Sequence, residues 1–435
     1  MAESAFETLR DVLPIGSSLA DDGRLEIGGV AVTDITREYG TPVQIFDEAG
    51  LRQTIRRFVD GLAERWPNSQ VLFASKSLPL FAMYSIAESE KLAVDVAGEG
   101  ELLLALAAGV SPERLHLHGN AKTDAEIQLA LEHRIGSIIV DGPDDIARIE
   151  RFAPEGYRQR ILIRVIPGVA ADTHSSMMTG GRTSKFGVLP SQANEMIRDL
   201  EQHPSIHVEG VHLHIGSQIL DAAPFALAVE TLAAFPEMEA YDVGGGLGVA
   251  YNAAHEPPQI EEYLDTIVNA AKRVLPSEAR LLIEPGRSIV GRSGVTAYDI
   301  STVKTTSKTF VAVNGGLADN VELYFVDEMS AIIADRAGLE PDTPVKVVGR
   351  QCESGDVFVR RGSLNAPEVG DVLVVPATGA YCYTMANNYN GALRLPVVFA
   401  ANGTVRVAAR RETRDEFMAL HAPAREADWA SLPSA

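Results

Sequence analysis

Three residues that can take part in covalent or proton-transfer chemistry lie at or just after apolar runs of the chain. They are Lys76, His214 and Glu284. A lysine in dry surroundings has a lowered pKa and can form an imine with a carbonyl compound. Taken alone, the position of Lys76 favours a side chain that reaches back to water over a lysine that forms an imine. His214 could lie flat against an aromatic ring.

Glycines and an arginine follow two of the later apolar runs. The sequence DVGGGLG spans 242–248, and EPGR spans 284–287. Consecutive glycines let backbone N–H groups approach an anion closely, although a flexible turn has the same composition. Arg287 can hold a phosphate or a carboxylate with its fork of donors, and Glu284 can pair with a pyridine nitrogen. Together with Lys76 for an aldehyde, these residues describe a pyridoxal 5′-phosphate site.

Two pairs of histidines could also concern a metal ion. They are His116 with His118 and His212 with His214. Alternate residues of a strand share a face, so each pair could approach a metal. The alternative is one inward histidine with a polar neighbour. Because no cysteine or further histidine follows at a suitable spacing, we expect no metal.

The elements that must position these residues are short strands and longer helices. Eight apolar runs alternate with helix-like stretches; they span 71–75, 92–96, 114–118, 137–141, 161–166, 207–215, 241–245 and 281–285. Eight βα units over about 220 residues are typical of a (β/α)8 TIM-type barrel, and this count favours the barrel over an open doubly wound sheet. In either fold, ligands bind at the carboxyl ends of the strands, where the residues above lie.

The texture of the sequence changes after residue 295. Short strand-like runs separated by Gly, Pro and Asn predict an antiparallel β-barrel or sandwich domain. Residues 23–47 have the same texture. We therefore expect an α/β chain in three parts: 1–47 contributes strands to the β-domain, 48–294 forms the cofactor-binding barrel, and 295–435 forms the C-terminal β-domain.

Composition limits the classes of partner. The 435 residues include 38 Lys and Arg against 59 Asp and Glu, a net charge of −21, so we expect neither nucleic acid nor an anionic membrane as a partner. Two cysteines, Cys352 and Cys382, argue against a disulfide framework or a zinc finger. The sequence shows no signal peptide and no run of 18 apolar residues. A cytoplasmic protein is expected.

A series of ordered blocks carries a family resemblance. The blocks are FASKS, LAVDVAGEGEL, LHGNAKT, SKFG, HLHIGSQI, DVGGGLG, EPGR, CESGD, GAYCYTMANNYN and RRET. With them, the sequence between about residues 40 and 415 resembles the diaminopimelate decarboxylases, members of the alanine-racemase-like (fold type III) pyridoxal phosphate enzymes. The resemblance implies a barrel followed by a β-domain. It also implies a head-to-tail homodimer whose active sites are shared between subunits.

The resemblance implies roles for individual residues. Lys76 would carry the cofactor as an internal aldimine, His214 would stack on its ring, and Glu284 would pair with the ring nitrogen. The other implied cofactor contacts are Asp95, Arg164, Ser217, Gly245, Gly246, Gly286, Arg287 and Tyr389. The amino-acid substrate would contact Arg287, Glu353 and Tyr389. Loss of CO2 from the external aldimine would leave a carbanion at Cα, which the thiol of Cys352 of the partner subunit would reprotonate.

One block departs from the family pattern. The usual form, DGGMxDNxRxALYG, has an arginine and a tyrosine that grip the distal carboxylate of the substrate. Here the stretch 314–328 reads NGGLADNVELYFVDE, with Glu322 in place of the arginine, Tyr324 as the nearest tyrosine, and Asp327 as a further acid. Like charges repel when desolvated. We therefore expect altered specificity, for a distal ammonium or a larger modified amino acid. In the alternative, Glu322 faces solvent, or a gap in the alignment places the carboxylate-binding residues elsewhere in the sequence.

Other functions stay open at this point. One is a genuine meso-diaminopimelate decarboxylase that makes L-lysine. The others are a pyridoxal phosphate-dependent racemase and a non-catalytic relative. The block CESGD belongs to the decarboxylases and argues against a racemase. Lys76, Glu284 and Cys352 occur together, which argues against a non-catalytic relative.

Overall fold

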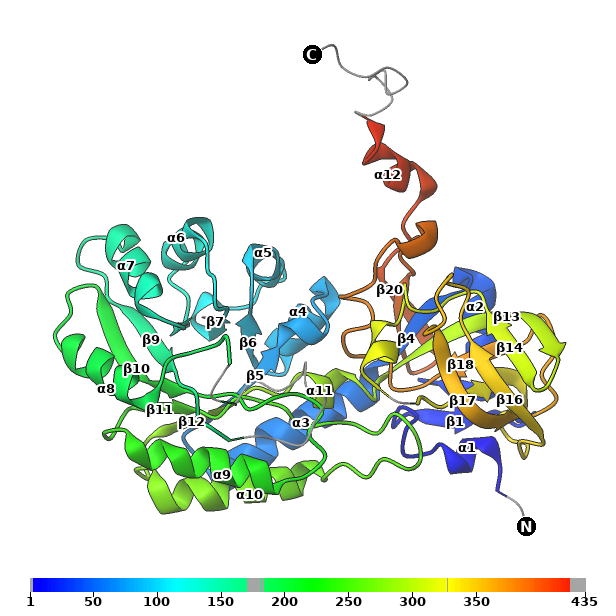
Figure 1. Ribbon diagram of the computed structural model, residues 1–435, viewed down its shortest axis with the longest axis horizontal. Coiled ribbons are helices and arrows are strands. Elements are labelled where there is room, and N and C mark those ends of the chain that lie inside the picture. Colours follow the sequence, from blue (N-terminus) through cyan, green and yellow to red (C-terminus); the bar gives the residue numbers. More distant parts are fainter. Residues whose placement is uncertain (1–2, 170–180, 182–183, 327, 423–435) are drawn as a thin grey trace.

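The computed structural model describes residues 3–169, 181, 184–326 and 328–422. Figure 1 shows two bodies side by side, a helix-covered barrel and a domain built mainly of strands. Within the described ranges, none of the helices has the length and apolar character needed to span a membrane.

The eight apolar runs form the eight strands of a closed barrel in which every neighbouring pair is parallel. The predicted barrel is thus confirmed over the open sheet. The strands are β5 (Ser69–Ala74), β6 (Ala93–Val96), β7 (Leu115–Leu117), β8 (Ser137–Val140), β9 (Gln159–Arg164), β10 (Ile206–His212), β11 (Ala240–Asp242) and β12 (Arg280–Ile283). The helices of this part are α3 (Glu48–Arg65), α4 (Phe81–Ser89), α5 (Glu99–Ala107), α6 (Asp124–Glu132), α7 (Pro143–Phe152), α8 (Pro190–Asp199), α9 (Ala223–Glu230), α10 (Ile260–Val274) and α11 (Arg287–Val290).

The barrel strands are apolar on both faces. One face fills the barrel with a separate small core made of Leu72, Ala93, Ile139, Leu162, Ala240 and Leu282. The other face, which includes Phe73 and Val94, joins the large core beneath the helices. Strands that are buried on both faces read as continuous apolar runs. This is why the barrel strands could be read from the sequence.

The second body is a sheet in the order β17-β16-β14-β13-β4-β19-β20, with β18 pairing β13 and β15. Its strands are β4 (Val43–Asp47), β13 (Gly294–Thr305), β14 (Thr309–Val313), β15 (Ile332–Ile333), β16 (Thr343–Val348), β17 (Val357–Leu364), β18 (Val372–Val375), β19 (Val397–Ala401) and β20 (Thr404–Ala409). Most pairs are antiparallel as expected, but β14 with β16 and β4 with β19 are parallel. A long connection separates the strands of each parallel pair, and such connections allow parallel pairing.

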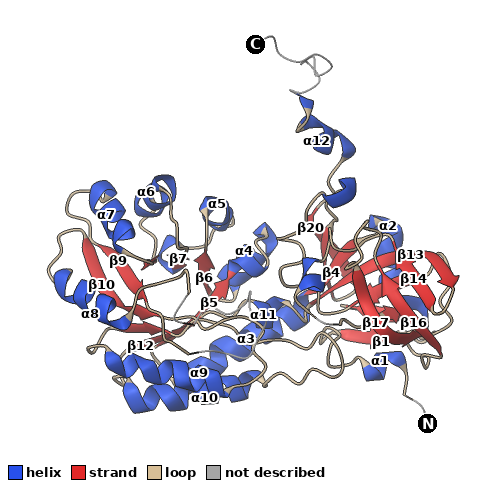
Figure 2. Cartoon of the chain, viewed as in Figure 1, coloured by secondary structure: helices blue, strands red, loops and turns tan. Residues whose placement is uncertain are grey.

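The N-terminal segment contributes one strand to this sheet and builds a smaller sheet of its own. β4 lies between β13 and β19, which confirms that an N-terminal strand completes the β-domain. β1 (Ser17–Leu19), β2 (Leu25–Ile27) and β3 (Val30–Ala31) pair only with one another in the described chain. Helices α1 (Ala5–Thr8) and α2 (Val32–Tyr39) flank them. At the other end, α12 (Arg414–Ala419) extends away from both bodies and buries none of its residues (Figure 2).

Candidate active site

A cavity of about 540 Å³ opens at the carboxyl ends of the barrel strands. This volume suits a small cofactor together with a substrate. The cavity brings together many of the residues predicted from the sequence: Lys76, Arg164, His214, Ser217, Gly246, Glu284, Gly286, Arg287 and Glu322. The β-domain closes one side of it with Phe325, Tyr381 and Met385. The site therefore lies between the two bodies of the chain.

Lys76 lies in a short 3₁₀ turn, η1 (Ser75–Ser77), directly after β5. Its Nζ is 3.9 Å from Oδ2 of Asp95, a buried residue in β6. Burial lowers the pKa of Lys76, but the charges of Asp95, Tyr381 and Glu284 outweigh it and raise the pKa above its ordinary value. The pKa of Lys76 thus differs from the lowered pKa of a lysine in dry surroundings, because a buried carboxylate faces the amine.

His214 presents a neutral ring to the cavity. Burial, Lys76 and Arg164 hold the pKa of His214 well below its usual value. Its Nδ1 accepts a hydrogen bond of 3.2 Å from the backbone N–H of Gly245. The hydrogen of the neutral ring is therefore on Nε2. A ring fixed in this way can lie against a flat aromatic group.

The glycine loop after β11 brings the main chain up to the cavity wall. A Cβ on Gly245 would lie 2.0 Å from the carbonyl oxygen of Glu284, and a Cβ on Gly246 would lie 2.5 Å from that of Gly216. Only glycine permits so close an approach. Beside the loop, Nε of Arg287 donates to Oγ of Ser217 at 3.2 Å. Backbone, hydroxyl and guanidinium donors thus gather in one place, and this donor set fits a phosphate.

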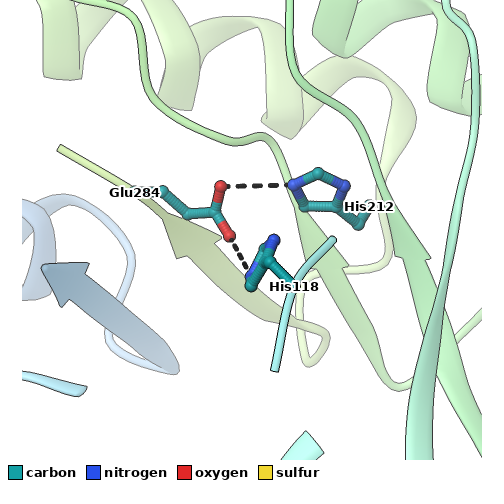
Figure 3. A group of neighbouring side chains, drawn as sticks. All are labelled: His118, His212 and Glu284. Atoms are coloured by element: carbon teal, nitrogen blue, oxygen red, sulfur yellow. Dashed lines mark hydrogen bonds and ion pairs between the residues drawn. The ribbon is translucent and has the colours of Figure 1, made fainter. Parts of the chain in front are cut away.

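Two histidines that the sequence did not assign hold the carboxylate of Glu284 (Figure 3). Nε2 of His212 is 3.2 Å from Oε2, and Nε2 of His118 is 3.0 Å from Oε1. Burial would raise the pKa of Glu284, but the two histidines outweigh burial and hold it well below its ordinary value. An ionised carboxylate fits a partner that carries a proton on a ring nitrogen. The two histidine pairs noted in the sequence could have indicated this contact, because one member of each pair, His118 or His212, lies against Glu284.

His118, His212 and Glu284 are also the one group in the described ranges whose geometry could hold a metal ion. Both histidines already direct Nε2 at the carboxylate oxygens. The expectation that the protein uses no metal stays a prediction.

Glu322 lies in the 3₁₀ turn η5 (Val321–Tyr324) and is 3% exposed, so the alternative in which it faces solvent is wrong. Its Oε2 is 2.8 Å from Nη1 of Arg287 and accepts a hydrogen bond of 3.1 Å from the hydroxyl of Tyr251. The guanidinium of Arg287 also lies over the ring of Tyr381, 4.7 Å from its centroid. Glu322 is therefore one half of a buried ion pair with Arg287. The sequence did not reveal the roles of Tyr251 and Tyr381.

Two further predicted residues support the cavity from the barrel side. Arg164 is the last residue of β9, is buried, and lies 4.2 Å from the ring centroid of Phe186. Asp95 is 1% exposed and reaches both Lys76 and His118. Burial raises the pKa of Asp95 above its ordinary value, more than His118 and Lys76 lower it.

The other predicted residues form a separate group on the β-domain, here called the surface cluster: Tyr324, Cys352, Glu353 and Tyr389. All four are exposed. The hydroxyl of Tyr389 donates to the carbonyl of Cys352 at 3.4 Å, and the N–H of Cys352 donates to Asn390 at 2.8 Å. Within one chain these residues do not line the described cavity, whereas Tyr381 does. Asp327 lies outside the described residues.

The surface cluster borders the cavity through η5. This turn carries Glu322 on the cavity side and Tyr324, which is 54% exposed, on the side of the cluster. The two groups of predicted residues therefore lie on either side of one turn of chain.

Comparison with known proteins gives a consistent result. Residues 52–291 match the family described as "Pyridoxal-dependent decarboxylase, pyridoxal binding domain". The chain is 39% identical to a diaminopimelate decarboxylase of Bacillus subtilis (strain 168), over 92% of this chain and 96% of that protein. It is 37% identical to one of Actinosynnema pretiosum subsp. auranticum, over 96% of each. The crystal structure of diaminopimelate decarboxylase from M. jannaschii in complex with L-lysine matches with a TM-score of 0.86 and 28% identity, over 94% of this chain and 98% of that one.

Proposed function

Since the chain belongs to the pyridoxal-dependent decarboxylases and uses pyridoxal 5′-phosphate, we propose that it removes CO2 from Cα of meso-diaminopimelate and makes L-lysine. One observation carries the proposal: a single cavity joins Lys76, the ionised Glu284 and the donor set around Gly246. The relatives named above support this choice of substrate. They are diaminopimelate decarboxylases, and this chain matches them over nearly their whole length.

The residues present fit the cofactor at each of its functional groups. Lys76 would hold its aldehyde, His214 its ring face, and Glu284 its ring nitrogen. The phosphate would be held by Ser217, Gly245, Gly246, Gly286 and Arg287, with Asp95 and Arg164 supporting the site. When bound, the cofactor withdraws electrons from Cα and so stabilises the charge that departing CO2 leaves behind.

We assign the return of the proton to Cys352 of the partner subunit. In this chain Cys352 is exposed, close to Tyr389 and next to the cavity-bordering turn η5, but it is not part of the cavity wall. A second copy in a head-to-tail dimer would supply the thiol, with Glu353 and Tyr389 beside it to contact the substrate. A thiol within reach of Cα can donate the proton that replaces CO2.

The ion pair of Arg287 and Glu322 would form the distal subsite. The far end of diaminopimelate is itself an amino acid with an ammonium and a carboxylate. A buried cation beside a buried anion offers a partner to each of these charges. Because Glu322 is already neutralised by Arg287, it does not have to repel a carboxylate. The pairing and the names of the relatives favour diaminopimelate over the altered specificity expected from the sequence.

A second candidate substrate carries only an amine at its far end, as lysine and ornithine do. The observation that favours it is Glu322 itself, an acid at the cavity wall in the position where the family pattern has an arginine.

A panel of substrates tests the proposal. CO2 release would be measured from meso-diaminopimelate, lysine, ornithine, arginine and glutamate, with Lys76→Ala as the control for background release. We expect the highest kcat/KM for meso-diaminopimelate. Faster turnover of lysine or ornithine would establish the second candidate instead. No CO2 from the whole panel would contradict decarboxylation of these amino acids.

A further inference from the structure

A continuous series of titratable side chains runs beside the cavity, which Lys76, His118 and Glu284 line. Nζ of Lys76 is 3.9 Å from Asp95, and Oδ1 of Asp95 is 3.8 Å from Nε2 of His118. The same Nε2 is 3.0 Å from Oε1 of Glu284, whose Oε2 is 3.2 Å from His212. Figure 3 shows the last two contacts. The series therefore runs from the lysine to the carboxylate proposed for the ring nitrogen.

His118 is the branching point of this series. One nitrogen atom, Nε2, faces two acids that belong to opposite ends of the site, Asp95 and Glu284. An imidazole nitrogen carries at most one hydrogen, so it can donate to only one of the acids at a time. The shorter distance shows that it favours Glu284 in this structure. His212 differs because the acid its Nε2 faces is Glu284 alone among the described residues.

The polar atoms at this branching point are buried and incompletely bonded. Oδ2 of Asp95, Oε1 of Glu284 and Nε2 of His118 have no well-aligned hydrogen-bond partner among the described residues, although ion-pair distances are met. Buried groups of this kind interact strongly because little water screens them. A change of charge at one acid is therefore felt at the other through His118.

We propose that His118 is a positioning residue that couples Lys76 to Glu284, so that the proton at the lysine nitrogen depends on the carboxylate that faces the cofactor ring. This inference rests on the roles proposed for Lys76 and Glu284. His118 itself need not contact the substrate. The titratable and charged groups that act on it or on the two acids it faces include Lys76, Asp95, Glu101, His116, Arg164, His212, Asp242 and Glu284.

The consequence has a definite sign. Without His118, Glu284 loses one of the two groups that keep it ionised and holds a proton more readily. A ring nitrogen that faces a more basic carboxylate carries less positive charge. The lysine nitrogen then keeps its own proton to a higher pH, because less positive charge lies nearby.

Spectroscopy of the cofactor-loaded protein tests the coupling without relying on turnover. The visible absorbance band of bound pyridoxal phosphate is titrated with pH in wild type, His118→Asn, His118→Gln and His133→Asn. We expect the midpoint to rise by about half to one pH unit in both His118 variants. His133 is exposed and does not line the cavity, so its substitution is the control with an unchanged midpoint.

A cycle with Asp95→Asn decides whether the effect passes through Asp95. We expect His118→Asn to shift the midpoint less in the Asp95→Asn background than in wild type. Equal shifts in both backgrounds, or an unshifted midpoint in both His118 variants, would overturn the coupling. If one His118 variant fails to fold, the other decides. No visible band in the wild type would instead overturn the proposed function, so the two failures can be told apart.

Discussion

At the scale of residues, acidic side chains of the cavity are paired with basic ones that the protein itself supplies. Lys76 faces Asp95, Glu284 faces two histidines, and Arg287 faces Glu322. An isolated buried charge is strongly unfavourable, so each partner makes the other tolerable. The site therefore has fixed charges before any ligand enters it, and few of its groups have to reorganise.

The pair of Arg287 and Glu322 leads to a first prediction. Glu322→Gln removes the charge that balances a buried guanidinium, so we expect a loss of roughly 3 kcal/mol in the free energy of unfolding. The same change should raise KM for meso-diaminopimelate, because the ammonium at the far end of the substrate loses its proposed anionic partner. Denaturant unfolding and steady-state kinetics measure the two effects. Unchanged stability together with unchanged KM would contradict the pairing.

Residue chemistry was only partly readable from the sequence. Lys76 and Glu284 could be predicted because each directly follows an apolar strand. The partners of these residues could not, because pairing depends on strands that meet only in the closed barrel. His118 and His212 show this: their spacing was visible, but which member of each pair faces Glu284 depends on register. Arg287 and Glu322 meet only when the β-domain closes on the barrel.

At the scale of elements, buried strands were predictable and the pairing direction of the sheet was not. Each barrel strand lies within a few residues of its predicted run. The parallel pairs β14 with β16 and β4 with β19 depend on long connections, which leave no local pattern. Within one chain Tyr381 lines the cavity and Tyr389 does not. Both come from the segment between β18 and β19, whose conformation the sequence did not reveal.

The loop between β14 and η5 gives a prediction about pH. Burial raises the pKa of Asp319 to about 7, while its hydrogen bond from Gly316 lowers it less. The ordinary value is 3.8, so between pH 4 and 7 the folded chain binds more protons than the unfolded chain. Stability from this group therefore falls as pH rises through that range.

Asp319→Asn should remove the loss of stability that Asp319 causes as the pH rises. We expect its Tm to exceed that of wild type above about pH 7, with the difference shrinking toward about pH 4. Thermal unfolding across this range measures it, with the exposed Asp335→Asn as the control. A difference in Tm that is the same at every pH would be inconsistent with a buried, protonated Asp319.

At the scale of the whole molecule, the active site is divided between the two bodies and, as proposed, between two chains. The barrel provides the cofactor residues, and the β-domain provides Glu322, Phe325 and Tyr381 as one wall of the cavity. The surface cluster with Cys352 lies beside that wall and faces outward. The thiol of Cys352 does not line the cavity of its own chain. A second chain is the simplest way to bring this thiol to a cavity.

Mixing two inactive variants tests whether each active site is shared between two chains. Lys76→Ala and Cys352→Ala should each be inactive as pure proteins. Co-expressed, they should recover up to roughly a quarter of wild-type activity, because half of the dimers are mixed and each mixed dimer has one intact site. Cys382→Ser, in the buried cysteine, serves as the control pairing. No recovered activity would mean that each chain completes its own site.

The central claim is that the barrel-mouth cavity holds pyridoxal phosphate through Lys76. Borohydride reduction of the loaded protein fixes the cofactor to its lysine, and peptide mass spectrometry then locates it. The account predicts one modified peptide, the one that contains Lys76, and its loss in Lys76→Ala. Modification at Lys185, which also lines the cavity, or at the buried Lys122 would contradict the account.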